Sequence, residues 1–150
     1  MVESPDCYHD FRGYYWTLLK DSKQVYNHDK ITISRRHTLR GIHGDFVTTK
    51  KVSCVYGEVY CVVVDKRPNS PTYDEWRWVM LTHTNRKSIT IPPGVGLSYL
   101  VMSAEASILY NLSNPGDYQD VDSQFTFKWN DPDLSIDWPI SDPILQKRDK

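Results

Sequence analysis

Short runs of alternating apolar and polar residues recur along the chain, and this period of two is typical of β-strands with one buried face. No window of 11 or more residues free of Gly and Pro has apolar positions at helical spacing. The alternation predicts strands over residues 14–19, 30–34, 51–56, 59–65, 76–81, 88–91, 99–103, 106–112 and 124–129. Strands at intervals of about 8 to 12 residues, separated by turn residues, predict an all-β sandwich or barrel with little helix.

Two connections have a specific predicted form. Gly57 joins the runs 51–56 and 59–65, and we expect these runs to pair as a β-hairpin. Beyond residue 129 the chain is punctuated by proline, which predicts a coil that wraps the domain instead of extending the sheet. The last residues, 146–150, are expected to form a frayed end.

The composition agrees with one soluble domain spanning residues 1–150. Charged residues make up 25% of the chain and hydrophobic residues 39%, and the length allows a sizeable core. A net charge of −1 gives no reason to expect nucleic acid or an anionic membrane surface as a partner. The three cysteines lack metal-ligand spacing, the N-terminus has no signal-like segment, and no apolar run approaches the roughly 20 residues of a membrane span. We therefore expect a reduced, cytoplasmic protein.

Reactive side chains are concentrated in one segment of about a dozen residues. A guanidinium, an imidazole, a carboxylate and an ammonium occur there, with two glycines between them: Arg40, His43, Asp45 and Lys50. Glycine lets a strand bulge and lets a ligand approach the backbone. This combination suits removal of a proton next to a carbonyl group, beside a bound anion. The next residue, Lys51, is expected to be solvated.

Further motifs occur in order along most of the chain. They are Leu-Arg-Gly-Ile-His at 39–43, Lys50, Val-Val-Val-Asp-Lys-Arg at 62–67, Ile-Pro-Pro-Gly at 91–94, Tyr110, Trp-Asn-Asp-Pro at 129–132 and Ile-Asp-Trp-Pro at 136–139. This combination resembles the nucleotide-sugar 3,5-epimerases, whose best-known members act on dTDP-4-keto-6-deoxyglucose in rhamnose synthesis. The Gly-Asp pair after His43 is most similar to epimerases of other NDP-4-keto sugars, heptoses included. The resemblance implies a cupin-type jelly roll, a homodimer with exchanged N-terminal strands, and no cofactor.

The resemblance also implies a role for each reactive residue. His43 matches the base that removes a proton next to the C4 carbonyl, and Asp149 matches the carboxylate that orients this base. Tyr110 matches the proton donor on the opposite sugar face, and Lys50 matches a lysine near O4 that would stabilise an enolate. Arg40 matches a residue that contacts the substrate or its phosphates. Alternatively, the histidine and the tyrosine are ordinary core residues, and the aspartate belongs to the frayed end.

The spacing of Arg40 and His43 raises a geometric condition. Residues three apart lie on opposite faces of a regular strand, so both can face one pocket only if the backbone is irregular. We therefore predict a bulge or distortion near Gly41.

The chain also departs from the family pattern at positions that usually contact the sugar. The segment 28–34, with His28 and Lys30, stands where the family has Gln-Asn-x-Ser-x-Ser, and Leu97 replaces a histidine that often follows Pro-Pro-Gly. We expect His28 and Lys30 to bind a substrate other than the common dTDP-hexose. Arg12 and Tyr118 are at places suited to contact the nucleotide, although a structural role at the dimer seam is an alternative for Arg12.

The sequence also bears on functions other than epimerisation. The single histidine in His43-Gly44-Asp45 lacks the His-x-His pair of metal-binding cupins, so no metal is expected. No glycine-rich phosphate loop opens a helix, so bound NAD or ATP is not expected. A 3,4-ketoisomerase of keto-sugar nucleotides and a non-catalytic sugar-nucleotide-binding cupin are the alternatives. The nucleotide, hexose or heptose, and inversion at C3, C5 or both stay open.

Overall fold

The computed structural model describes residues 1–20, 22–116 and 121–149, and these residues form an almost entirely β structure. The strands are β1 (Val2–Glu3), β2 (Cys7–Asp10), β3 (Gly13–Trp16), β4 (His28–Arg35), β5 (Leu39–Gly44), β6 (Thr49–Tyr56), β7 (Glu58–Asp65), β8 (Trp76–Thr82), β9 (Ser88–Ile91), β10 (Val95–Val101), β11 (Glu105–Ser113) and β12 (Phe125–Thr126). In this part of the chain, helix is limited to two short 3₁₀ turns, η1 (Val121–Ser123) and η2 (Lys147–Asp149). The predicted all-β class is confirmed.

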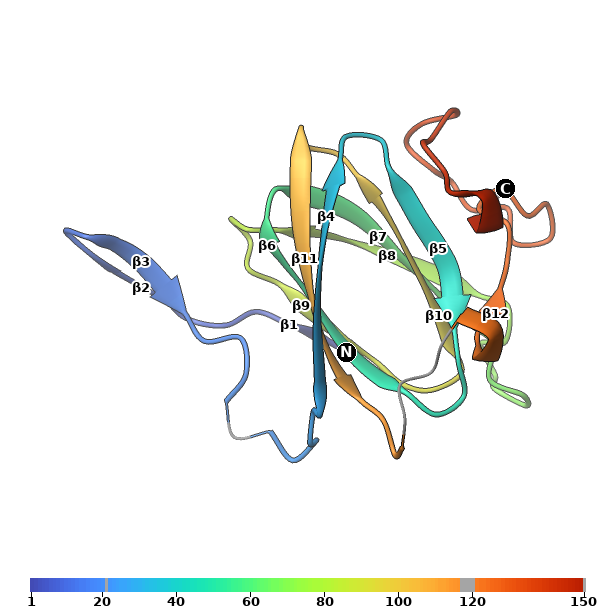
Figure 1. Ribbon diagram of the computed structural model, residues 1–150, viewed down its shortest axis with the longest axis horizontal. Coiled ribbons are helices and arrows are strands. Elements are labelled where there is room, and N and C mark those ends of the chain that lie inside the picture. The colour runs from blue at the N-terminus through green and yellow to red at the C-terminus, as the bar shows by residue number, and fades with distance from the viewer. Residues whose placement is uncertain (21, 117–120, 150) are drawn as a thin grey trace.

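Two five-stranded sheets face each other as a jelly roll (Figure 1). One sheet has the order β1-β9-β6-β11-β4, and the other has the order β12-β5-β10-β7-β8. Strands β2 and β3 pair only with each other and form a hairpin that projects away from the body. The C-terminal tail lies on the opposite side of the molecule from this hairpin (Figure 1).

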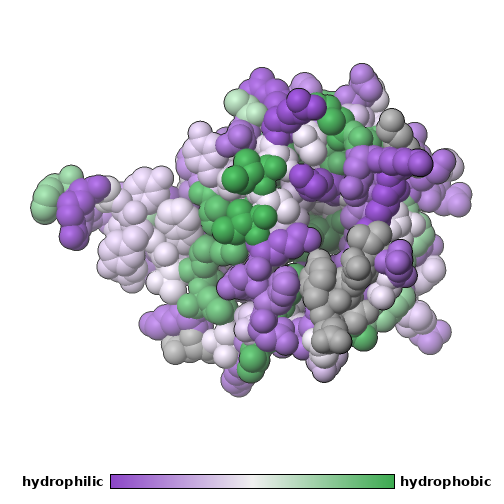
Figure 2. All heavy atoms as spheres, viewed as in Figure 1, coloured by the Kyte–Doolittle hydropathy of each residue, from purple (hydrophilic) through white to green (hydrophobic). Residues whose placement is uncertain are grey.

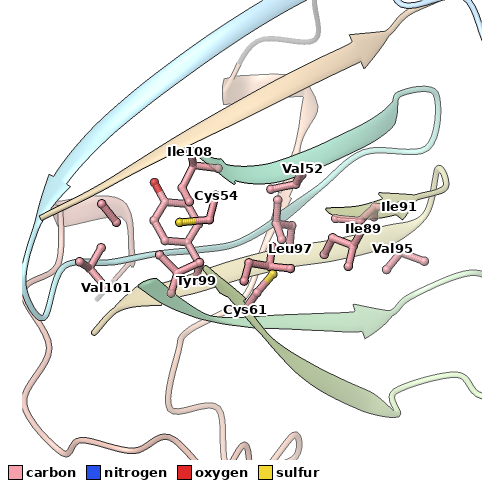
Figure 3. Packing of buried hydrophobic residues seen from close by; sticks show 13 residues of the cluster. Val52, Cys54, Cys61, Ile89, Ile91, Val95, Leu97, Tyr99, Val101 and Ile108 are labelled. Atoms are coloured by element: carbon pink, nitrogen blue, oxygen red, sulfur yellow. The ribbon is translucent and has the colours of Figure 1, made fainter. Parts of the chain in front are cut away.

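The two faces of β7 pack against different apolar clusters, because successive side chains of a strand point to opposite faces. Val59 and Cys61 belong to the cluster that fills the space between the sheets, where side chains from both sheets converge (Figure 3). Tyr60, Val62 and Val64 belong to a second cluster on the outer face. Both faces of this strand are therefore buried.

The C-terminal tail covers that outer face, as the sequence predicts. Leu134 is 5% exposed within the second cluster, and Trp129, Trp138 and Leu145 pack against it. The indole N–H of Trp138 donates to the carbonyl of Trp129 at 2.7 Å. Burial of a leucine side chain contributes roughly 1.5–3 kcal/mol, so the tail is a fixed part of the fold.

Most predicted strands lie within observed ones, but several boundaries differ. The run 14–19 is a strand only as far as Trp16, and β10 begins at Val95, directly after the turn at Gly94, instead of at residue 99. In the run 124–129 only Phe125 and Thr126 form a strand, because the chain then leaves the sheet edge and enters the tail.

The predicted hairpin across Gly57 is wrong. β6 pairs with β9 and β11, whereas β7 pairs with β10 and β8, so the two strands lie in different sheets. Gly57 has a φ of +77°, and a Cβ at this position would lie 2.1 Å from the carbonyl oxygen of Glu105. The chain thus crosses from one sheet to the other through a tight turn that only glycine can adopt without strain.

Lys51 is buried, which corrects the expectation that it is solvated. Its side chain is 5% exposed, and its ammonium group pairs with the carboxylate of Glu3 on β1. Thr90 Oγ1 donates to the same carboxylate at 3.1 Å. The hydrogen bond from Lys51 holds the pKa of Glu3 below its usual value. The pairing of β1 with β9 supplies this partner from a distant part of the chain.

Candidate active site

A cavity of about 100 Å³ opens between the two sheets and collects most of the predicted site residues. Strands β4, β5, β6, β10 and β11 and the loop after β5 contribute to its wall. The lining residues are Lys30, Arg40, His43, Asp45, Thr48, Lys50, Leu97, Tyr99, Tyr110, Leu112 and Gln124.

A bulge in β5 brings Arg40 and His43 to the same cavity. His43 lies opposite Leu97 and Arg40 lies opposite Tyr99, so three steps along β5 match two along β10. Gly41, inside this irregular segment, has a φ of +116°. The predicted distortion is therefore present, and it removes the geometric objection to a shared site.

Asp149 lies against the imidazole of His43. Its Oδ1 is 2.9 Å from Nε2, and the side chains are 0% and 18% exposed, respectively. Gln146 Nε2 donates to the same oxygen at 3.2 Å. Burial raises the pKa of Asp149, but His43, Gln146 and the backbone amide of Gly41 outweigh this effect and leave the pKa below its usual value. The expectation of a frayed end is wrong at this residue, because η2 is docked against β5.

Arg148 contacts the other nitrogen of the same imidazole. Its Nη2 lies 2.9 Å from Nδ1 of His43 and 3.0 Å from both Gln124 Oε1 and Thr126 Oγ1. A guanidinium can only donate, so Nδ1 accepts and the proton of the neutral ring is on Nε2, facing Asp149. Two consecutive residues of η2 thus contact the two nitrogens of His43.

Lys50 and Asp45 form an ion pair at the cavity wall. The Nζ to Oδ2 distance is 3.4 Å, and the side chains are 11% and 2% exposed. Burial lowers the pKa of Lys50 below its usual value, although Asp45 partly opposes this effect. The buried surroundings have a lower effective dielectric than water. An ammonium here therefore interacts more strongly with a developing anion than it would in water.

Tyr110 comes from β11, which faces the cavity from the other sheet. Burial raises its pKa well above the usual value, and hydrogen bonding with Tyr99 adds to this effect. The hydroxyls of Tyr99 and Thr32 are 2.8 Å apart in the same region. Lys30 Nζ lies over the Tyr110 ring, 5.8 Å from its centroid. The phenol is therefore held in its protonated form at neutral pH.

The predicted substrate-binding residues are only partly brought together. Arg40 lines the cavity and donates from Nε to Ser34 Oγ at 3.0 Å, and Lys30 lines it as well. His28 begins β4 and is not among the lining residues. Arg12 lies at the tip of the projecting hairpin, where it pairs with Asp10 at 2.6 Å. Tyr118 lies outside the described residues.

The position of Leu97 gives the cavity a partly apolar wall. Leu97 is 7% exposed and lies directly opposite His43, and Leu112 also lines the cavity. An apolar side chain next to the imidazole leaves that side without a hydrogen-bond partner for a sugar hydroxyl.

Several residues of the site were missed by the sequence reasoning. Arg148 and Thr126 contact Nδ1 of His43, and Gln124 accepts a hydrogen bond from Arg148. Asp45 has no role in the sequence-based interpretation, although it lies in the segment of reactive residues. Arg148 carries a detectable signal, since it directly precedes Asp149 in sequence, whereas Gln124 and Thr126 reach the site only through the pairing of β12 with β5.

The described residues contain no group of three or more His, Cys, Asp or Glu side chains arranged to hold a metal ion. No helix of residues 1–20, 22–116 and 121–149 has the length and apolar character needed to cross a membrane.

Comparison with known proteins places this geometry in context. A family model described as dTDP-4-dehydrorhamnose 3,5-epimerase matches residues 1–150. The dTDP-4-dehydrorhamnose 3,5-epimerase of Salmonella typhimurium is 30% identical over 161 residues, covering 99% of this chain and 86% of that protein. The dTDP-4-dehydrorhamnose 3-epimerase of Streptomyces niveus is 38% identical over 125 residues, covering 80% of this chain and 58% of that protein.

The solved structures include a similar fold with a bound sugar nucleotide. A dTDP-6-deoxy-D-glucose-3,5-epimerase from Legionella pneumophila, in complex with dTDP-4-keto-L-rhamnose, superposes with a TM-score of 0.91 at 30% identity. The alignment covers 99% of this chain and 83% of that one. The likeness therefore extends over the whole jelly roll and its tail.

Proposed function

The chain belongs to the dTDP-4-dehydrorhamnose 3,5-epimerase family, and from this premise we propose that it inverts C3, C5 or both in a nucleoside-diphosphate 4-keto sugar. The observation that carries the proposal is the shared cavity lined by His43, Lys50 and Tyr110. Enolisation next to a carbonyl needs a base, a positive charge near the oxygen and an acid on the other face. Binding alone would require neither the base nor the acid.

The first step is removal of a proton by His43. Nδ1 takes the proton from the carbon next to the C4 carbonyl, the electron pair of the C–H bond forms a double bond to C4, and the π pair of the carbonyl moves to O4 to give the enolate. Asp149, 2.9 Å from Nε2, stabilises the imidazolium. Arg148 has to leave Nδ1 before the sugar approaches, and repulsion between two cations keeps it away once the ring is charged.

The second step delivers a proton to the opposite face of the same carbon. The ammonium of Lys50 stabilises the charge on O4 while the enolate exists. The phenol of Tyr110 then donates its proton, and the enolate electron pair forms the new C–H bond. The phenolate regains a proton from solvent and the imidazolium loses one, so the sugar changes configuration without oxidation or reduction.

Substrate recognition is assigned to the positive groups around the cavity. Arg40 and Lys30 are placed to hold the diphosphate or the sugar oxygens, and a guanidinium fork suits a phosphate. We assign His28 to the mouth of the site. Arg12 lies between β2 and β3 of the projecting hairpin and is not among the residues that line the cavity, so a role for Arg12 in substrate binding rests on a second copy of the chain.

We further propose that the protein is a homodimer. The hairpin exposes large aromatic side chains, with Phe11 98% and Tyr15 61% exposed. On the face shown in Figure 2, hydrophobic side chains gather beside the hairpin, and Ile31 and Ile33 on the edge strand β4 are 63% and 62% exposed. An exposed apolar strand at a sheet edge favours pairing with another chain.

We also propose that the protein is located in the cytoplasm. The cysteines Cys7, Cys54 and Cys61 are free thiols, which agrees with a reducing compartment.

Proton exchange in D2O tests the reaction directly. The protein is mixed with 4-keto hexoses and heptoses carried on dTDP, GDP, UDP or CDP, and the C3 and C5 protons are followed by NMR. Loss of signal at one or both carbons is expected with the correct sugar, and it identifies the inverted centres. His43→Asn should reduce the exchange at least about a hundredfold while leaving ligand affinity nearly unchanged.

His37→Asn is the matched control, because His37 is exposed and its φ of 64° is one that asparagine adopts readily. Unchanged turnover in His43→Asn would remove His43 as the base. Movement of the carbonyl from C4 to C3 would indicate a ketoisomerase instead. Saturable binding without exchange for every sugar would indicate a non-catalytic sugar-nucleotide binder.

A further inference from the structure

The two carboxylate oxygens of Asp45 serve different partners. Oδ1 accepts the backbone N–H groups of Val47 at 3.0 Å and Thr48 at 2.6 Å, which fixes the turn between β5 and β6. Oδ2 has no hydrogen-bond partner in the described part of the chain, and it faces Nζ of Lys50 at 3.4 Å. One oxygen therefore holds the loop, and the other is directed at the lysine.

The turn that Asp45 fixes is itself anchored to the rest of the barrel. Thr48 is 3% exposed, and its Oγ1 donates to Asn114 Oδ1 at 2.6 Å. Asn114 is joined in turn to Asn27 through its backbone N–H, at 3.0 Å. The carboxylate of Asp45 is consequently held in one place, and Lys50 is the group that can adjust to it.

Lys50 needs such a partner because other positive groups surround it. Lys30 and Arg148 both lower its pKa in addition to the larger effect of burial. Arg40 and His43 line the same cavity from β5, and Tyr110 faces it as a neutral phenol from β11. Among the charged side chains of the described residues that line the cavity, Asp45 is the negative one.

Resting on the function proposed above, we propose that Asp45 is a positioning residue that fixes the Lys50 ammonium at the cavity wall and keeps it positively charged for the enolate oxygen. The carboxylate does not touch the reacting atoms, and it acts through the lysine. At 3.4 Å the contact is long for an ion pair, so the ammonium can turn towards O4 without breaking a short hydrogen bond.

The proposal has a defined consequence for the pH dependence. Catalysis requires protonated Lys50, so activity is lost as pH rises through the pKa of this lysine, which burial places below its usual value. Removing the negative charge lowers that pKa further, because an opposite charge within about 4–6 Å shifts a pKa by about one to three units. The alkaline limb of kcat should therefore move to lower pH by about the same amount.

Asp45→Asn is the sharpest test, since an asparagine oxygen can still accept the Val47 and Thr48 amides while the charge is removed. Asp131→Asn is the matched control: Oδ1 of Asp131 accepts the N–H of Asp133 at 3.0 Å in a similar turn, and Asp131 does not line the cavity. If Asp45→Asn fails to fold, Asp45→Ser supplies a hydroxyl acceptor for the same turn and is used instead.

The charge state of Lys50 can be measured without any substrate, so the role of Asp45 can be tested separately from the proposed function. Acetic anhydride labelling of the ligand-free protein at a series of pH values gives the midpoint at which the Lys50 amine becomes reactive, with exposed Lys20 as the internal standard. Peptide mass spectrometry measures the extent of labelling. The midpoint should fall by about one to three pH units in Asp45→Asn and stay unchanged in Asp131→Asn.

If Asp45→Asn folds and the labelling midpoint of Lys50 is unchanged, the inference is overturned, regardless of which substrate the protein accepts. An unchanged alkaline limb of kcat in an active variant would do the same. If no keto sugar undergoes exchange, the proposed function fails, and a lowered midpoint would still establish that Asp45 holds the lysine in its charged form.

Discussion

At the scale of single residues, the site depends on how His43 is held. Asp149 and Arg148 contact its two nitrogens, at 2.9 Å each, although Arg148 is 105 positions away in sequence. The contact with a pure donor on one side fixes the ring proton on the other side. The imidazole is therefore oriented with Nε2 towards Asp149 and Nδ1 towards Arg148.

The protonated phenol of Tyr110 leads to a testable prediction about inversion. Its raised pKa keeps the phenol protonated through neutral and mildly alkaline pH, so the group can donate but does not compete as a base. Tyr110→Phe should slow inversion by about 10²- to 10⁴-fold, the range of a general acid. Loss of the substrate proton to D2O should fall far less, because His43 still works from its own face. NMR of product and exchanged substrate measures both rates.

The control is Tyr60→Phe, which removes a hydroxyl that donates to the Asp137 carbonyl at 3.2 Å, on the outer face of the sheet. Both rates should be unaffected by it. If inversion and exchange fall equally in Tyr110→Phe, the tyrosine has a wider role than proton donation.

At the scale of elements, β5 determines whether the site exists. A regular strand would turn Arg40 away from the cavity, and the bulge at Gly41 prevents this. A Cβ at Gly41 would lie 2.4 Å from the carbonyl oxygen of Leu97 and 2.8 Å from Cα of Ser98, both backbone atoms of β10. The close approach of two strands thus requires glycine at this position.

Gly41→Ala should therefore destabilise the fold by roughly 2–4 kcal/mol, from the strained φ and the clash together. Urea unfolding followed by fluorescence measures this change. Gly116→Ala is the control, because no heavy atom of the described residues lies within 4 Å of its Cβ position, and it should change stability by less than about 0.5 kcal/mol. An equally small effect at Gly41 would mean that β5 can relax around an added methyl group.

The C-terminal tail is the second element that decides the site. Its proline-rich part packs on the outer face of the sheet, and η2 then returns to β5 so that Asp149 is fully buried. Ile144 forms a parallel bridge with Thr38, just before β5. This bridge fixes the position of the tail shortly before η2. The tail consequently covers the outer cluster and also supports the His43 imidazole through Asp149.

At the scale of the whole molecule, the separate hairpin and the exposed face of β4 are the features that a single chain does not explain. The hairpin pairs with no other strand of the described structure, and it carries exposed aromatic rings with Tyr8 stacked on Tyr15 at 5.4 Å. A second copy would bury these rings and would place Arg12 near another molecule.

Charge substitution on these surfaces should dissociate the proposed dimer. Tyr15→Asp and Ile33→Asp are each expected to shift sedimentation from a dimer to a monomer at micromolar concentration, because a buried unpaired carboxylate is strongly unfavourable at an interface. Ile144→Asp is the control, since Ile144 is 41% exposed and belongs to the tail on the other side of the molecule (Figure 1). A monomer observed for the unmodified protein at tens of micromolar would contradict the proposal.

The amino-acid sequence alone is sufficient to predict most strands, the all-β class and several of the residues that line the cavity. Alternation reports which positions of a strand face a core, so most strands were placed within a few residues. The spacing of Arg40 and His43 around a glycine also determined that β5 had to be irregular. These features depend on a few consecutive residues, and local physics is sufficient to predict them.

Which distant segments come into contact is visible only in the folded protein. Alternation is the same whether consecutive strands form a hairpin or cross between sheets, so the turn at Gly57 was misjudged. The burial of Lys51 required β1 as a neighbour, and the place of Arg148 at Nδ1 of His43 required the docked tail. Contacts between distant segments are selected by closure of the whole barrel, because their favourable energy appears only when both sheets and the tail are assembled.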